Sequence, residues 1–178
     1  MCYSSNAYLL RLIEIWKGEE CTWNERNLNQ LRFYEEVRKN PRGELEALFK
    51  IFELKTENAS DWDYCLLLSD IAEKQVELEE IQEAFDTVLK MLPRLKNICD
   101  WKNFGLGRSF IGTCMDIIIS GSSDNAIQLW NYMKPYVVKM EYIDYEKVAT
   151  AADKMGDEDL SKLFLKRLAI WKESLPFL

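Results

Sequence analysis

Apolar residues spaced three and four apart, with short polar turns between them, are the feature that most constrains the fold of this chain. Side chains at this spacing lie on one face of an α-helix. One stripe, within residues 8–17, comprises Leu9, Leu12, Ile13 and Trp16. Another, within residues 42–55, comprises Leu45, Leu48, Phe49 and Phe52. A helix is also predicted from Asn24 or Arg26 to Lys39, ending at Asn40-Pro41. Strand signals are weak, so the sequence predicts an all-α protein.

The composition supports a packed helical fold. Only 7 Gly and 4 Pro occur among 178 residues, which argues against disorder and against a loop-rich β fold. Hydrophobic residues make up 48% of the chain, enough to fill a core. The length predicts one domain or one compact repeat array. In this prediction residues 1–61 form an N-terminal helical cap, and residues 62–178 form three helical hairpins packed with it.

Three segments after residue 61 look alike, each with a helix, a short polar turn and a second helix. The turn centres are predicted at Val76, Gly121 and Gly156, which are 45 and 35 residues apart. The corresponding hairpins cover about 62–95, 107–140 and 142–175. The segment 96–106 reads as a linker between the first two hairpins, and Gly105-Leu-Gly107 reads as a turn.

Small residues recur at matching positions of these hairpins. In the first helices they are Ser69, Cys114 and Ala149. In the second helices they are Ala126 and Ser161, whereas Ile81 departs from the pattern. A larger residue follows at Phe85, Trp130 and Leu165, Pro93 ends the first hairpin, and Met155-Gly156-Asp157 forms a turn. Together these residues resemble tetratricopeptide (TPR) repeats, a helix-turn-helix family with a period of 34 residues.

The resemblance implies antiparallel helical hairpins stacked as a short α-solenoid. A HEAT-like hairpin array or an irregular helical bundle remains an alternative, because in each case a hairpin buries its apolar face only by stacking on a neighbour.

The chain contains no histidine, which excludes His-based triads, His-ligated zinc sites and acid–base catalysis by histidine. Its five cysteines are odd in number and include no Cys-x-x-Cys pair: Cys2, Cys21, Cys65, Cys99 and Cys114. We therefore expect reduced thiols, with no disulfide framework and no zinc knuckle. No cofactor or metal is predicted.

The sequence predicts neither a secretion signal nor a membrane span. The N-terminal residues lack a basic region, and Arg11 interrupts the first apolar stretch. Nowhere do 18 uncharged apolar residues follow one another. The expectation is a cytoplasmic protein with no membrane partner.

The net charge of −7 argues against nucleic-acid binding through a broad basic surface. Residues 62–95 hold three cations and eight acids, and so carry most of the excess. The acids cluster at Glu77, Glu79, Glu80, Glu83 and Asp86, and the spacing predicts one helix face for Glu79, Glu83 and Asp86. Such a cluster is either a solvated face or a surface that attracts a basic protein.

The resemblance also implies that the first helix of each repeat lines a groove for a peptide or protein. By matching positions, the groove would include Asp63, Leu66, Asp70 and Lys74; Arg108, Ile111, Met115 and Ile118; and Glu146, Thr150, Asp153 and Lys154.

The leading interpretation is a non-enzymatic module that binds a basic protein or peptide, acting as an adaptor or inhibitor. One concrete version is an immunity-type protein that masks a basic toxin or nuclease. The predicted contact residues are Asp63, Asp70, Lys74, Glu79, Glu80, Glu83, Arg108, Met115, Glu146, Thr150, Asp153 and Lys154. The alternatives are a carboxylate-based enzyme, with or without a divalent metal, and a structural subunit of a larger assembly.

Overall fold

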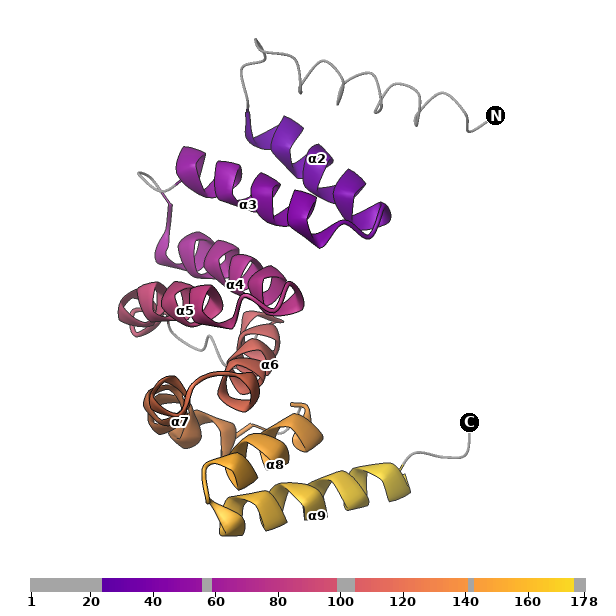
Figure 1. Ribbon diagram of the computed structural model, residues 1–178, viewed down its shortest axis with the longest axis vertical. Helices are drawn as coiled ribbons and strands as arrows, with labels where there is room; N and C mark the ends of the chain where they lie inside the picture. Colours follow the sequence, from indigo (N-terminus) through magenta and orange to yellow (C-terminus); the bar gives the residue numbers. More distant parts are fainter. Residues whose placement is uncertain (1–23, 56–58, 99–104, 141–142, 175–178) are drawn as a thin grey trace. The chain divides into compact units, whose positions relative to one another are not determined.

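The computed structural model describes residues 24–55, 59–98, 105–140 and 143–174, and every regular element in these ranges is an α-helix. The all-α prediction is therefore confirmed for this part of the chain, while the helix expected over residues 8–17 lies outside it (Figure 1). The helices are α2 (Glu25–Val37), α3 (Pro41–Lys55), α4 (Asp61–Glu77), α5 (Ile81–Leu95), α6 (Gly105–Ser120), α7 (Ser123–Val137), α8 (Tyr145–Lys154) and α9 (Glu158–Ser174). The chain divides into two compact units, residues 1–60 and 61–178.

The described part of the first unit is the hairpin of α2 and α3. Asn24 starts α2 by accepting a hydrogen bond from the Asn27 amide at 3.0 Å. Pro41 occupies the first position of α3, where its missing N–H costs no helical hydrogen bond. Leu28 and Leu48 are fully buried between the two helices. Both helices therefore begin within one residue of the predicted positions.

In the second unit α6 is the central helix, since it packs against α4, α5, α7 and α8 (Figure 1). Its buried apolar residues point in more than one direction around the helix axis: Phe110, Ile111, Cys114, Met115, Ile117 and Ile118. A helix that is apolar on most sides is stable only when neighbours cover it on most sides. Gly105 and Gly107 lie in the first turn of α6, so the predicted turn at these glycines is wrong.

Three of the connections between paired helices share one backbone geometry. Lys39, Glu79 and Gly156 each have a left-handed conformation, with φ of 54°, 62° and 70°. In the second of these turns the Glu80 amide donates to the Gln75 carbonyl at 2.8 Å, and the Glu79 amide donates to the Val76 carbonyl at 3.0 Å. The other two turns have the same pair of bonds, which is the Schellman pattern of helix termination.

These turns correct the predicted alignment of the repeats. Val76 lies inside α4, and the turn residue is Glu79, three positions later. With the turns placed at residues 79, 121 and 156, the small residues fall at constant distances from them. Seven residues before each turn the chain has Ala72, Cys114 and Ala149, and five residues after each turn it has Ala84, Ala126 and Ser161. All six are buried. The small positions of the first hairpin are therefore Ala72 and Ala84, and not Ser69 and Ile81 as predicted. Small side chains at these positions let the paired helices approach closely.

The second helices α5 and α7 also correspond, at a spacing of 42 residues. Five pairs of positions are buried in both: Ala84 and Ala126, Thr87 and Leu129, Val88 and Trp130, Met91 and Met133, Leu95 and Val137. Pro93 and Pro135 share a position as well, and both lie inside their helices. The agreement in burial shows that these two helices use equivalent faces for packing.

Candidate partner-binding surfaces

The acidic cluster surrounds the turn between α4 and α5. Glu79 lies in the turn, Glu80 directly precedes α5, and Glu83 lies in the first turn of that helix. The prediction that Glu79, Glu83 and Asp86 share one helix face is wrong, because α5 begins only at Ile81. Glu79 and Glu83 are exposed and form no side-chain hydrogen bond or ion pair, so their carboxylates face solvent. An acid at Glu83 also suits the positive N-terminal end of the helix dipole.

A second acidic surface lies on α8. Glu146, Thr150 and Asp153 are exposed, and their spacing places them on one face of the helix. The Thr150 hydroxyl donates to the Glu146 backbone carbonyl at 2.9 Å, which leaves the Glu146 carboxylate uninvolved. Neither Glu146 nor Asp153 uses its carboxylate in an intramolecular bond. We call these three residues the α8 ridge.

Lys154, by contrast, binds within the protein. Its ammonium group donates to the carbonyls of Ile119 at 2.8 Å and Gly121 at 3.0 Å, at the end of α6. Lys147 joins the same two helices through an ion pair with Asp116 at 2.7 Å. A cation at the C-terminal end of a helix satisfies carbonyls that lack a helical partner. Lys154 therefore stabilises the packing of α8 on α6.

The predicted residues of α4 are partly engaged too. Asp63 is exposed, whereas Asp70 and Lys74 are half-buried. Lys74 forms an ion pair with Glu77 at 2.8 Å. Leu66, from the same predicted groove, has 40% of its side chain exposed. These residues lie on α4, in the same hairpin as Glu79, Glu80 and Glu83.

On α6 the prediction fails. Met115 is fully buried, as are Ile111 and Ile118, so none of them presents a contact surface. The reason is the central position of α6, which α4, α5, α7 and α8 cover on several sides. Arg108 lies in the first turn of α6, and its side chain is outside the described part of the structure.

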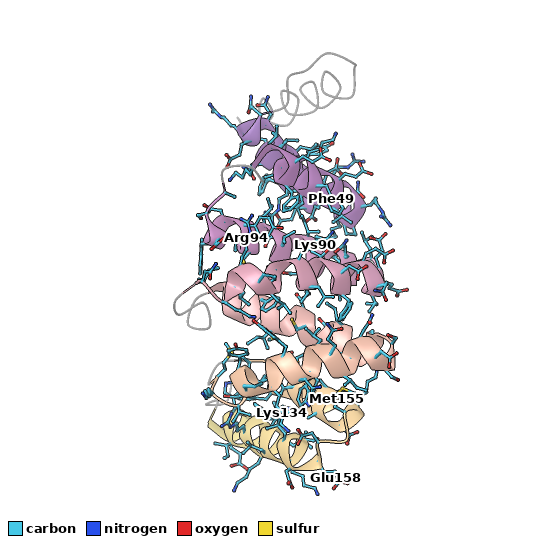
Figure 2. The ribbon with its side chains drawn as sticks, turned by 90° about the vertical axis from the view of Figure 1, so that its left-hand side faces the viewer. Phe49, Lys90, Arg94, Lys134, Met155 and Glu158 are labelled. Atoms are coloured by element: carbon cyan, nitrogen blue, oxygen red, sulfur yellow. The ribbon has the colours of Figure 1, made fainter. Side chains whose placement is uncertain are left out.

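Two cations of the second helices, Arg94 and Lys134, contact neighbouring elements (Figure 2). Arg94 of α5 lies over the Tyr64 ring, 3.8 Å from its centre, and 3.7 Å from the Asp61 carboxylate. Lys134 of α7 forms an ion pair with Asp157, in the turn between α8 and α9. These basic residues were not singled out from the sequence, where nothing marks their partners.

Two of the five thiols lie in the described ranges, and both are buried. Desolvation, aided by the charge of Asp61, raises the pKa of Cys65 to about 11, and burial raises the pKa of Cys114 as well. A nucleophilic cysteine needs a lowered pKa and access to solvent. Cys65 and Cys114 are therefore structural residues, and Cys2, Cys21 and Cys99 lie outside the described ranges.

Within residues 24–55, 59–98, 105–140 and 143–174, no three Cys, Asp or Glu side chains are grouped closely enough to hold a metal ion. No described helix combines the length and apolar character needed to cross a membrane. Comparison with known protein families, curated sequences and solved structures finds no match to this chain.

Proposed function

We propose that this chain is a non-enzymatic module that binds a basic protein or peptide through the acidic surface of its second unit. The observation that carries the proposal is that Glu79, Glu83, Glu146 and Asp153, four of the predicted contact residues, have exposed carboxylates with no intramolecular partner. Carboxylates that are not already paired can form ion pairs with an incoming Lys or Arg, and they speed the approach of a basic partner.

The proposal extends to the arrangement of the hairpins as a short TPR-like α-solenoid in the cytoplasm. Its support is the recurrence of small buried residues at equivalent positions, together with the repeated turn geometry. In such an array the exposed faces of α4 and α8 contribute to one extended surface. Asp63, Asp70 and Glu80 would add to the binding surface. An inhibitor that masks a basic toxin or nuclease is the version that best uses acidity in a small protein.

The test uses the whole protein as bait in a lysate of its native host. The first variant carries Glu79→Lys, Glu80→Lys and Glu83→Lys, and the second carries Glu146→Lys and Asp153→Lys. A matched control reverses three exposed acids of the first unit, Glu36→Lys, Glu46→Lys and Glu53→Lys, which gives the same change in net charge as the first variant.

Partners specific to the wild type are identified by mass spectrometry. The proposal predicts a basic protein that the control retains and that at least one of the two acidic-surface variants loses. Equal recovery on all four baits would overturn it, as would partners that are acidic or nucleic acids. Circular dichroism melts verify that each variant is folded before its result is used.

A further inference from the structure

The end of the second unit exposes positions that its earlier hairpins bury. In α5 the residues nine, twelve and sixteen positions after the turn are Val88, Met91 and Leu95, and in α7 they are Trp130, Met133 and Val137. Each of these six side chains is at most 5% exposed. The matching residues of α9 are Leu165, Leu168 and Lys172, counted from Gly156.

In α9 these same positions are less buried than in α5 and α7. Leu165 is 51% exposed, Leu168 is half-buried and Lys172 is exposed. Phe164 and Ser161, which match the inward residues of α7, remain buried. The uncovered face of α9 therefore corresponds to a face that the earlier second helices keep packed. Its chemistry fits another helix with apolar residues, because helices cover the equivalent residues of α5 and α7.

The first unit offers a helix of that kind. Phe33 and Val37 of α2 are 61% and 66% exposed, and their spacing places them on one face. Arg26 lies on the same face, seven residues before Phe33, and it too is exposed. The α8 ridge beside α9 bears the opposite charge, through the carboxylates of Glu146 and Asp153. Phe33 and Val37 thus offer apolar contact to Leu165 and Leu168, and Arg26 is opposite in charge to the carboxylates of the α8 ridge.

From this complementarity we infer that copies of the protein associate head to tail, with the α2 face of one copy seated on the α8–α9 face of another. The contact is heterologous, since the two surfaces differ, so it allows more than two copies to join. It involves few residues on each side, which is typical of a weak and concentration-dependent interaction.

Analytical ultracentrifugation of the full chain tests the inference. The mass should rise above 21.0 kDa as the concentration increases from about 5 μM to about 300 μM. Phe33→Glu combined with Val37→Glu should give a monomer, and so should Leu165→Arg alone. All three positions are exposed, so the substitutions spare the core. Ile127→Glu is the control, because Ile127 is 50% exposed on α7, and it should associate like the wild type.

Mixing the two monomeric variants is the decisive step. Each retains one intact face, so an equimolar mixture should form a 1:1 dimer and nothing larger. A wild type that stays monomeric over the whole range would overturn the inference. So would a mixture that remains monomeric, because each variant keeps the face that the other has lost. A restored dimer would exclude symmetric pairing, since pairing of like faces could not join these two variants.

Discussion

Glu79 and Gly156 occupy the same position in two different turns, and both adopt a left-handed backbone conformation, with φ of 62° and 70°. Only the second residue is a glycine, for which this conformation is free of steric cost. For a residue with a Cβ atom it costs roughly 1–2 kcal/mol. The two turns therefore terminate their helices with the same hydrogen bonds but at different conformational cost.

The first prediction concerns this pair. Glu79→Gly should raise the free energy of unfolding by up to about 1 kcal/mol, because the strain is relieved while glycine adds entropy to the unfolded chain. Gly156→Ala should lower the free energy of unfolding by about 1 kcal/mol, since the φ of 70° is retained. Urea unfolding measures both. Equal effects of the same sign would contradict the assignment of a common turn.

Two other glycines should respond to alanine in opposite directions. A Cβ atom at Gly112, inside α6, would meet no atom within 4 Å, whereas one at Gly121 would lie 2.6 Å from the Ile117 carbonyl oxygen. Gly112→Ala should therefore stabilise the protein by about 0.5–1 kcal/mol through helix propensity. Gly121→Ala should destabilise it, because backbone has to move. A stabilised Gly121→Ala variant in thermal unfolding would refute the packing described at this turn.

Lys154 should matter for stability more than for binding. Lys154→Met removes both hydrogen bonds to the end of α6 and should lower the free energy of unfolding by about 1 kcal/mol, a value reduced for solvent exposure. The control is Lys162→Met, whose ion pair with Glu158 is a surface pair worth close to zero. If both variants had the same stability in urea, the Lys154 contact would be without energetic effect.

The buried thiols predict a pH dependence. The folded pKa of Cys65 is raised to about 11 from 9.0, and that of Cys114 is raised as well. Well below pH 9 both thiols are protonated in the folded and the unfolded state, so they contribute no pH dependence. Above pH 9 the unfolded chain releases these protons first, so stability falls as the pH rises toward 11. The decline should be shallower in a Cys65→Ala, Cys114→Ala variant. If the free energy of unfolding fell equally with pH in the variant and the wild type, the buried thiols would not be the cause of the decline.

The presence of helices and their approximate residue ranges could be predicted from the sequence, because both depend on the local spacing of apolar residues. The position of the turn at Glu79 could not be predicted. The polar stretch around Val76 suggested a turn there, and no glycine marks Glu79 as the left-handed residue. That error of three residues assigned Ser69 and Ile81 to positions held by Ala72 and Ala84. Met115 was misassigned for a different reason, because a shared register does not reveal that α6 is covered on several sides.

For the acidic surfaces the sequence predicted which residues are charged, but not which of them form bonds within the protein. Glu146 and Asp153 remain unpaired, whereas Lys154, adjacent to Asp153, binds the carbonyls of another helix. That difference depends on which helix lies beside α8, a long-range contact that one-dimensional spacing does not contain. The exposure of the α9 face could not be predicted either. Leu165 occupies the repeat position of Trp130, but Trp130 is buried and Leu165 is exposed.

The most direct test of the central claim is the affinity of the basic partner for wild-type protein and for the Glu79→Lys, Glu80→Lys, Glu83→Lys variant, measured by calorimetry at several salt concentrations. The account predicts a loss of about ten-fold or more, with a weaker salt dependence, and no comparable loss for the control with Glu36, Glu46 and Glu53 reversed. Unchanged affinity and salt dependence in this variant, and in the one with Glu146→Lys and Asp153→Lys, would contradict the claim.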